Sequence, residues 1–154
     1  PLIQLVPQFK FHHQLKMARV FASLLAREMG DRPSRTRPEV IIPVPLHPRR
    51  LRERGYNQAL EIARLLARPL GIPVDFRLCQ RTRYTAPQTG LDAKARRQNL
   101  RNAFGLTGRC DYKHVAILDD VITTGNTVSE LAKLFAKNGV EEIEIWSVAR
   151  AVVD

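Results

Sequence analysis

Residues 115–127 read VAILDDVITTGNT, an apolar run that leads into two adjacent carboxylates and then into a turn rich in threonine. The β-branched and aliphatic residues of the run predict a buried strand over 115–121. Apolar residues at helical spacing then predict a helix over 126–137. The stretch is therefore a strand, a short turn and a helix, with Asp119 and Asp120 at the carboxyl end of the strand.

A turn in this position is suited to binding a phosphate group. Ligands of open α/β sheets bind outside the carboxyl ends of the strands, and the backbone amides and dipole of a helix amino terminus attract anions. Gly125 lets the backbone approach a ligand because it has no Cβ, and the threonine hydroxyls donate hydrogen bonds. We predict that the phosphate of a ribose 5-phosphate binds at Thr123, Thr124, Gly125, Asn126 and Thr127.

The two carboxylates have a different predicted role. They would repel a phosphate, so we expect them to accept hydrogen bonds from neutral donors such as the vicinal hydroxyls of a ribose. In a catalytic site, Asp119 and Asp120 would also stabilise positive charge that develops on the sugar ring.

Three other kinds of phosphate or nucleotide site fit the stretch less well. A Walker A loop needs a lysine after its last glycine, where this chain has Asn126. A dinucleotide fingerprint needs three glycines, and this turn has Gly125 alone. A phosphoacceptor receiver domain needs an aspartate on a later strand, and none follows Asp120 before Asp154. A capped helix that binds no ligand stays open as the structural alternative.

The rest of the chain continues the alternation of strands and helices. The predicted helices cover 13–29 and 57–69, and the predicted further strands cover 39–44, 72–78 and 140–149. Asn57 is the expected N-cap of the second helix, and Trp146 is expected in the core rather than on a binding surface. This order predicts one α/β domain over residues 1–154, with a mainly parallel, twisted sheet flanked by helices.

Composition limits the classes of function. Lys and Arg outnumber Asp and Glu by 25 to 15, and 19 of the cations are Arg. The charge is uneven, with 21 basic and 7 acidic residues up to residue 110 but 4 and 8 after it. A basic majority indicates a polyanionic partner, either a nucleic acid or a phosphorylated small molecule, although a basic surface without a target has the same composition.

Cysteine content and hydropathy indicate the redox compartment of the chain and its relation to membranes. Cys79 and Cys110 form no CxxC pair, so the chain predicts neither a disulfide scaffold nor a structural zinc site and fits a reducing cytoplasm. No apolar run is long enough to span a bilayer, so we expect no membrane insertion.

Residues 115–127 resemble the phosphoribosyl-pyrophosphate (PRPP) motif of type I phosphoribosyltransferases. A wider resemblance, over most of the chain, is to the ComF/GntX competence branch of that superfamily. It is carried by Pro43-Val44-Pro45-Leu46, Arg54-Gly55-Tyr56-Asn57-Gln58, Gln88 with Arg97, Asn99-Leu100 and Asn102-Ala103-Phe104. ComF-like proteins usually carry a zinc-binding, Cys-rich segment ahead of this domain, and this chain is expected to begin just after it.

The resemblance also implies roles for two basic segments. In type I enzymes the loop after the first sheet strand binds pyrophosphate, which here implies the segment 45–56. Its expected ligands are Pro45, Leu46, Arg49, Arg50 and Arg54, with Arg52 as a further cation. The segment 79–102 occupies the place of a mobile lid, with Arg81, Arg83, Gln88 and Arg97 facing the pyrophosphate. A solvated basic turn and a flap that touches nucleic acid are the respective alternatives.

Two functions from different classes therefore stay open. The first is a phosphoribosyltransferase-like domain that binds PRPP with Mg²⁺, without direct metal ligation by the protein, and that displaces pyrophosphate from C1 if it is catalytic. The second is a non-catalytic accessory protein of DNA uptake that handles single-stranded DNA, with a DNA-uptake helicase as a partner. The chain shows no clear acceptor-binding segment, and few aromatic residues (6%) weaken the second function because single-strand binding relies on base stacking.

Overall fold

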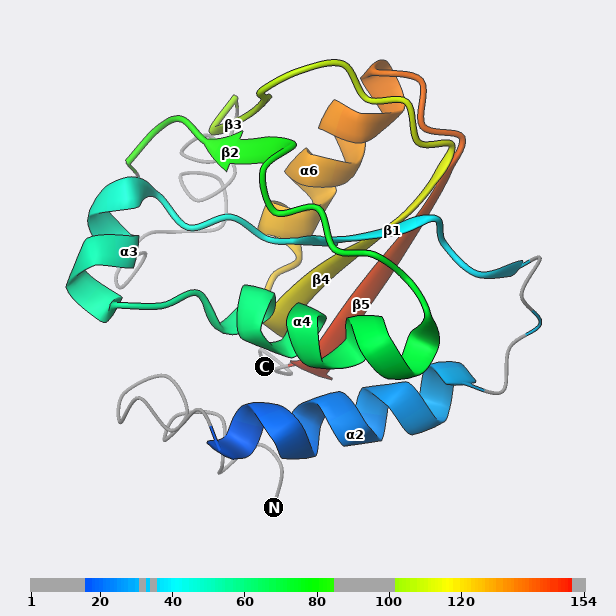
Figure 1. The fold of residues 1–154 in the computed structure, drawn as a ribbon. Coiled ribbons are helices and arrows are strands. Elements are labelled where there is room, and N and C mark those ends of the chain that lie inside the picture. The colour runs from blue at the N-terminus through cyan, green and yellow to red at the C-terminus, as the bar shows by residue number, and fades with distance from the viewer. Residues whose placement is uncertain (1–15, 31–32, 34–35, 85–101, 151–154) are drawn as a thin grey trace.

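A computed structural model describes residues 16–30, 33, 36–84 and 102–150 (Figure 1). Three parallel strands form the central sheet in the order β1 (Val40–Pro43), β4 (His114–Ile122) and β5 (Glu142–Arg150). A single bridge between Ile41 and Val74 adds to the outer edge of β1. Because β4 lies in the middle, its carboxyl end has neighbouring elements on both sides.

Helices cover the two faces of this sheet. On one face lies α4 (Gln58–Leu70), with α2 (Lys16–Gly30) packed against it, and on the other lies α6 (Asn126–Lys137) (Figure 1). The short strands β2 (Cys79–Arg81) and β3 (Phe104–Leu106) pair antiparallel on the α6 side, and the short helix α3 (Pro48–Arg54) follows β1. Within the described ranges, no helix is long and apolar enough to cross a membrane.

The side chains of β4 alternate between two hydrophobic clusters, as the pleat of a strand requires. Ala116 and Leu118 pack on the side of α2 and α4, together with Trp146. Val115 and Ile117 pack on the side of α6. All four β4 side chains are fully buried, so the strand is fixed from both faces before it reaches its polar end.

The structure confirms the predicted α/β fold with a parallel sheet and flanking helices. The helix over 126–137 has the predicted bounds. Asn57 is the N-cap of α4, since its side chain accepts a hydrogen bond from the Leu60 amide at 3.4 Å. Trp146 is 3% exposed and belongs to the core, as predicted.

The predicted strand over 72–78 is wrong apart from the bridge at Val74. Asp75 causes the break, because its Oδ1 accepts hydrogen bonds from the amides of Arg77 and Leu78, both at 3.0 Å. A side chain that binds the next amides competes with strand pairing in this way. The pairing resumes only at Cys79, in β2.

The segment 45–56, predicted to be a loop, contains α3. His47 caps this helix through its Nδ1, which accepts a hydrogen bond from the Arg49 amide at 3.2 Å. Pro48 stands at the first helical position, where its missing N–H costs nothing. The helix ends at Gly55, whose φ of 83° is left-handed. The cap at His47 and the proline at position 48 are sequence signals for the start of a helix. The prediction of a loop relied on the basic composition of the segment and did not use them.

The predicted lid over 79–102 begins with a strand rather than a loop. Arg81 lies in β2, paired with Phe104 of β3. The predicted lid residues Gln88 and Arg97 lie outside the described residues, within 85–101.

Candidate functional site

The turn between β4 and α6 leaves a helix amino terminus open. Gly125 is the N-cap residue of α6, with φ 73° and ψ 0°, and it has no side chain with which to cap the helix. The first backbone hydrogen bond across this end runs from the Ser129 amide to the Gly125 carbonyl, at 2.9 Å. The amides of the first helical turn have no acceptor within the helix, so they are available to an anion.

A small hollow of about 50 Å³ lies beside this open helix end. Its walls are Asp119, Val121, Ile122, Thr123, Thr124, Gly125, Asn126, Thr127 and Val128. The structure thus brings all five predicted phosphate-binding residues to one hollow with one of the two predicted carboxylates. Side chains do not fill the space between them.

Asp119 and Asp120 lie on different faces of the sheet. Asp119 follows the β4 positions that face α6 and lines the hollow. Asp120 follows the positions that face α4, where its charge helps to raise the pKa of Tyr56. Burial is the main cause of that rise, and Arg54 opposes it. Tyr56 was not among the residues expected at the site.

Each carboxylate is positioned by a hydrogen bond from the amide that follows it. Asp119 Oδ1 accepts from the Asp120 amide, and Asp120 Oδ1 accepts from the Val121 amide, both at 2.9 Å. These bonds fix one oxygen of each side chain against the backbone. Both aspartates are only partly buried as residues, but the second oxygen of Asp120, Oδ2, is itself fully buried.

Arg81 and Arg50 bring positive charge to the same region. The Arg81 guanidinium is largely buried, and this burial lowers its pKa. The nearby charge of Arg50 lowers the pKa further, while that of Asp119 raises it. Arg81 also stacks on Phe104, with Cζ 5.5 Å from the ring centroid. Residues from α3, β2 and β4 therefore converge at one end of the sheet.

Three of the predicted cations of α3, Arg50 among them, also contact other side chains. Arg49 Nε lies 3.0 Å from Glu53 Oε1, and Arg50 Nη1 lies 3.8 Å from Glu53 Oε2. Arg54 Nη1 donates to Gln58 Oε1 at 2.7 Å, which ties the end of α3 to the start of α4. Glu53 thus pairs with Arg49 and Arg50, and Gln58 with Arg54.

Pro45 and Leu46, also predicted to bind pyrophosphate, line a second and larger cavity of about 200 Å³. Its wall is mostly apolar and includes Leu51, Leu60 and Phe76. Arg81 borders this cavity as well. Arg83, predicted to belong to the lid, is exposed just after β2. The peptide bonds of the described segments are all trans, including those before the prolines of this region.

Comparisons with known proteins agree with this architecture. Residues 56–152 match the model of the phosphoribosyl transferase domain. The chain is 47% identical to competence protein F of Haemophilus influenzae over 158 aligned residues, which cover 98% of the chain and 69% of that protein. It is 39% identical to DNA utilization protein YhgH of Salmonella typhimurium, over 99% of the chain and 68% of that protein.

A solved structure has the same fold. The glutamine PRPP amidotransferase of B. subtilis aligns with a TM-score of 0.54 and 19% identity, over 85% of this chain and 26% of the larger chain. Identity at that level shows the fold and nothing more. The domain match and the close relatives together show that this chain belongs to the ComF family, whose members carry a type I phosphoribosyltransferase-like domain.

Proposed function

We propose that the chain binds PRPP, or a related ribose 5-phosphate, at the carboxyl end of β4. The observation that carries the proposal is the hollow between Asp119 and the uncapped amino terminus of α6. A phosphate seated there would accept hydrogen bonds from the first-turn amides and from Thr124 and Thr127, and it would lie at the positive end of the helix dipole. Asp119 would then accept a hydrogen bond from a ribose hydroxyl.

The pyrophosphate of PRPP is the part that calls for cations. Arg50 and Asp119 both lie near Arg81, because the charge of each affects the Arg81 pKa. Two guanidinium groups kept close together repel one another, and a pyrophosphate placed between them would relieve this repulsion. Mg²⁺ prefers oxygen ligands and would be held by PRPP itself, and the carboxylate and hydroxyl oxygens around the hollow are compatible with the ion and its water. When bound, the ion would neutralise charge on the pyrophosphate.

A phosphoribosyl transfer from this site would follow from the same contacts. The bond from C1 to the pyrophosphate oxygen breaks, a bond from C1 to a nitrogen nucleophile forms, and the nucleophile loses its proton to solvent. Arg50 and Arg81 would stabilise the departing pyrophosphate, and Asp119 and Asp120 the positive charge on the ring. Asp120 would act from the α4 side of the sheet, where it lies near Tyr56.

Two glycine substitutions test the binding site. Gly125 and Gly139 both have left-handed φ, 73° and 89°, and neither would bring a Cβ within 3.4 Å of another residue. Gly125→Ala and Gly139→Ala should therefore carry a similar backbone cost, of about 1–2 kcal/mol. Only Gly125→Ala should weaken binding of PRPP with Mg²⁺, because its methyl group adds to the wall of the hollow.

The experiment measures the rise in melting temperature caused by PRPP with Mg²⁺, against Mg²⁺ alone. We expect a rise for the wild type and for Gly139→Ala and a smaller rise for Gly125→Ala. No rise in the wild type at millimolar PRPP would count against the site. Equal rises in the two variants would place the ligand elsewhere.

A second candidate function is binding of single-stranded DNA, and two exposed aromatic side chains favour it. Phe76 is 45% exposed and lies near two guanidinium groups, with Arg64 Cζ at 5.6 Å and Arg77 Cζ at 5.5 Å from its ring centroid. Tyr84 is 38% exposed, and Arg49 Cζ lies 4.7 Å from its ring. Aromatic rings beside arginines bind bases by stacking and phosphates by charge.

The names of the relatives, a competence protein and a DNA utilization protein, agree with such a role, so we propose that the chain acts in the uptake or use of DNA. Binding of a labelled single strand should weaken in Phe76→Ala and Tyr84→Ala. Leu24→Ala, which removes an exposed side chain from α2, should leave it unchanged. Equal affinity in all three variants would exclude these rings as the stacking surface.

A further inference from the structure

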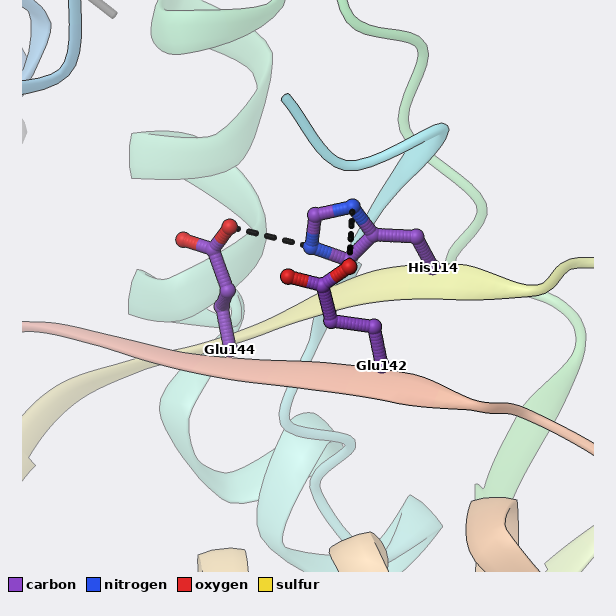
Figure 2. A group of neighbouring side chains, drawn as sticks. All are labelled: His114, Glu142 and Glu144. Atoms are coloured by element: carbon purple, nitrogen blue, oxygen red, sulfur yellow. Dashed lines mark hydrogen bonds and ion pairs between the residues drawn. The ribbon is translucent and has the colours of Figure 1, made fainter. Parts of the chain in front are cut away.

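A second group of polar side chains lies at the opposite end of β4. His114 is the first residue of β4, and it pairs in register with Glu142, the first residue of β5. Glu144 follows two positions later and therefore projects from the same face of β5 as Glu142. Figure 2 shows the two carboxylates converging on the imidazole ring. The group lies about 16 Å along the strand from Asp119.

One contact within the group is short and largely buried, and the other is longer and more exposed. His114 Nε2 lies 3.0 Å from Glu144 Oε1, and His114 Nδ1 lies 3.6 Å from Glu142 Oε2 (Figure 2). The side chains of His114 and Glu144 are 11% and 17% exposed, whereas that of Glu142 is 67% exposed. The group is thus closed on the protein side and open to solvent at Glu142.

Trp146 fixes the orientation of Glu144. Its Nε1 donates a hydrogen bond of 2.8 Å to Glu144 Oε2, which leaves Oε1 directed at the imidazole. A hydrogen bond that orients a ligand from behind is the usual companion of a metal-binding carboxylate. The indole therefore holds one donor atom in place in the absence of an ion.

The two ring nitrogens of His114 face two carboxylates, and a neutral imidazole has one N–H. Whichever nitrogen carries the proton, the other directs a lone pair at a carboxylate oxygen. A second proton or a metal cation placed between them would satisfy both electron pairs. One donor atom from each of the three side chains lies within 4.8 Å of the others. Donors on a single Zn²⁺ lie about 3–3.6 Å apart, so a small rotation of the exposed Glu142 would close the set.

We propose that His114, Glu142 and Glu144 form a binding site for one divalent metal ion of the Zn²⁺ class, with water completing the coordination. An imidazole nitrogen with two carboxylates suits Zn²⁺ better than Mg²⁺ or Ca²⁺, which prefer oxygen ligands alone. The ion would join the first residues of β4 and β5 and so stabilise the sheet at the end remote from the phosphate-binding turn. The proposal does not rest on the proposed phosphoribosyl function.

The chain contains one tryptophan, and this gives the test a direct signal. Zn²⁺ alone is titrated into the full chain, stripped of metal and kept reduced. Trp146 fluorescence is recorded, and the affinity is obtained by competition with a chromophoric chelator. We expect one ion per chain and a saturable change in fluorescence, since the ion would bind the carboxylate that the indole holds. Affinity should fall as the pH is lowered, because protons compete for the ligands.

Two glutamate variants supply the matched comparison. Glu142→Gln removes a proposed ligand, whereas Glu141→Gln removes the same charge from the adjacent residue, which pairs with Lys113 Nζ at 2.8 Å. Glu142→Gln should lower the Zn²⁺ affinity by about tenfold or more, and Glu141→Gln by about twofold or less, because exposed charges are screened. Glu142 is exposed, so its variant should fold even if His114→Gln does not. No saturable Zn²⁺ binding, or equal losses in the two variants, would overturn the proposal.

Discussion

Asp119 and Asp120 are adjacent in sequence, yet they face opposite sides of the central sheet. Asp119 lines the hollow at the amino terminus of α6, and Asp120 lies on the α4 side near Tyr56. The pleat of β4 imposes this separation, because successive side chains of a strand point to opposite faces. A ligand in the hollow therefore approaches the two carboxylates from different directions. We expect the two carboxylates to contribute unequally to its binding.

Asp119→Asn should weaken PRPP binding more than Asp120→Asn does. Asparagine keeps the oxygen that accepts the next amide, so both variants should fold, and the change tests the charge. We expect a loss of affinity of about 10- to 150-fold for Asp119→Asn, which is the equivalent of one charged hydrogen bond of about 1.5–3 kcal/mol. Isothermal titration calorimetry with PRPP and Mg²⁺ measures it, and Asp111→Asn, at an exposed aspartate, is the control. A larger loss for Asp120→Asn would reverse the assignment.

Arg81→Gln should weaken pyrophosphate binding without lowering the stability of the fold. Burial and the charge of Arg50 disfavour the Arg81 cation by more than the charge of Asp119 favours it, so its removal should leave the melting temperature unchanged or higher. The same variant should bind pyrophosphate more weakly, because one of two converging cations is lost. Thermal melting and a pyrophosphate titration check the two effects, with exposed Arg68→Gln as the control. Unchanged pyrophosphate affinity would remove Arg81 from the site.

Cys79 should be chemically inert in the folded protein. It is 4% exposed, and burial raises the pKa of its thiol to about 12. The reactive form of cysteine is the thiolate. Iodoacetamide at pH 8 should therefore modify Cys110, which is partly exposed, and spare Cys79 until denaturant is added. Peptide mass mapping shows which thiol has reacted, and rapid labelling of Cys79 under native conditions would contradict its burial.

The same thiol predicts how stability depends on pH. Its pKa is about 12 in the folded chain, against an ordinary value of 9.0, so the folded state favours the protonated form. The contribution to stability is complete below pH 9 and is lost as the pH rises from about 9 to 12. Urea unfolding at pH 8 and pH 10 should show a smaller decline for Cys79→Ala than for the wild type. Equal declines would assign the effect to other groups.

Much of the fold and the phosphate-binding turn follow from local sequence. The apolar run before Asp119, the glycine at position 125 and the helical spacing after it lie within 23 consecutive residues, and the structure keeps them together. Local patterns failed where a side chain competes with the backbone. Asp75 interrupts an apolar run that otherwise has the composition of a strand, and His47 caps a helix inside a segment that composition assigned to a loop.

Other features depend on which elements become neighbours, and no local pattern contains that information. Arg81 reaches Asp119 only because β2 packs on the α6 side of the sheet. His114 meets Glu142 through the register of β4 with β5, across 28 residues of sequence. The one local signal for that group was the spacing of Glu142 and Glu144, which places both carboxylates on one face of a strand.

The central claim is that a ribose 5-phosphate binds with its phosphate at the amino terminus of α6. A titration of the ¹⁵N-labelled chain with ribose 5-phosphate, followed by amide NMR, tests this directly. We predict that the largest, saturable shifts fall on the amides of residues 124–128, since these N–H groups would donate to the phosphate. Saturable shifts confined to other parts of the chain, or none at millimolar ligand, would contradict the account.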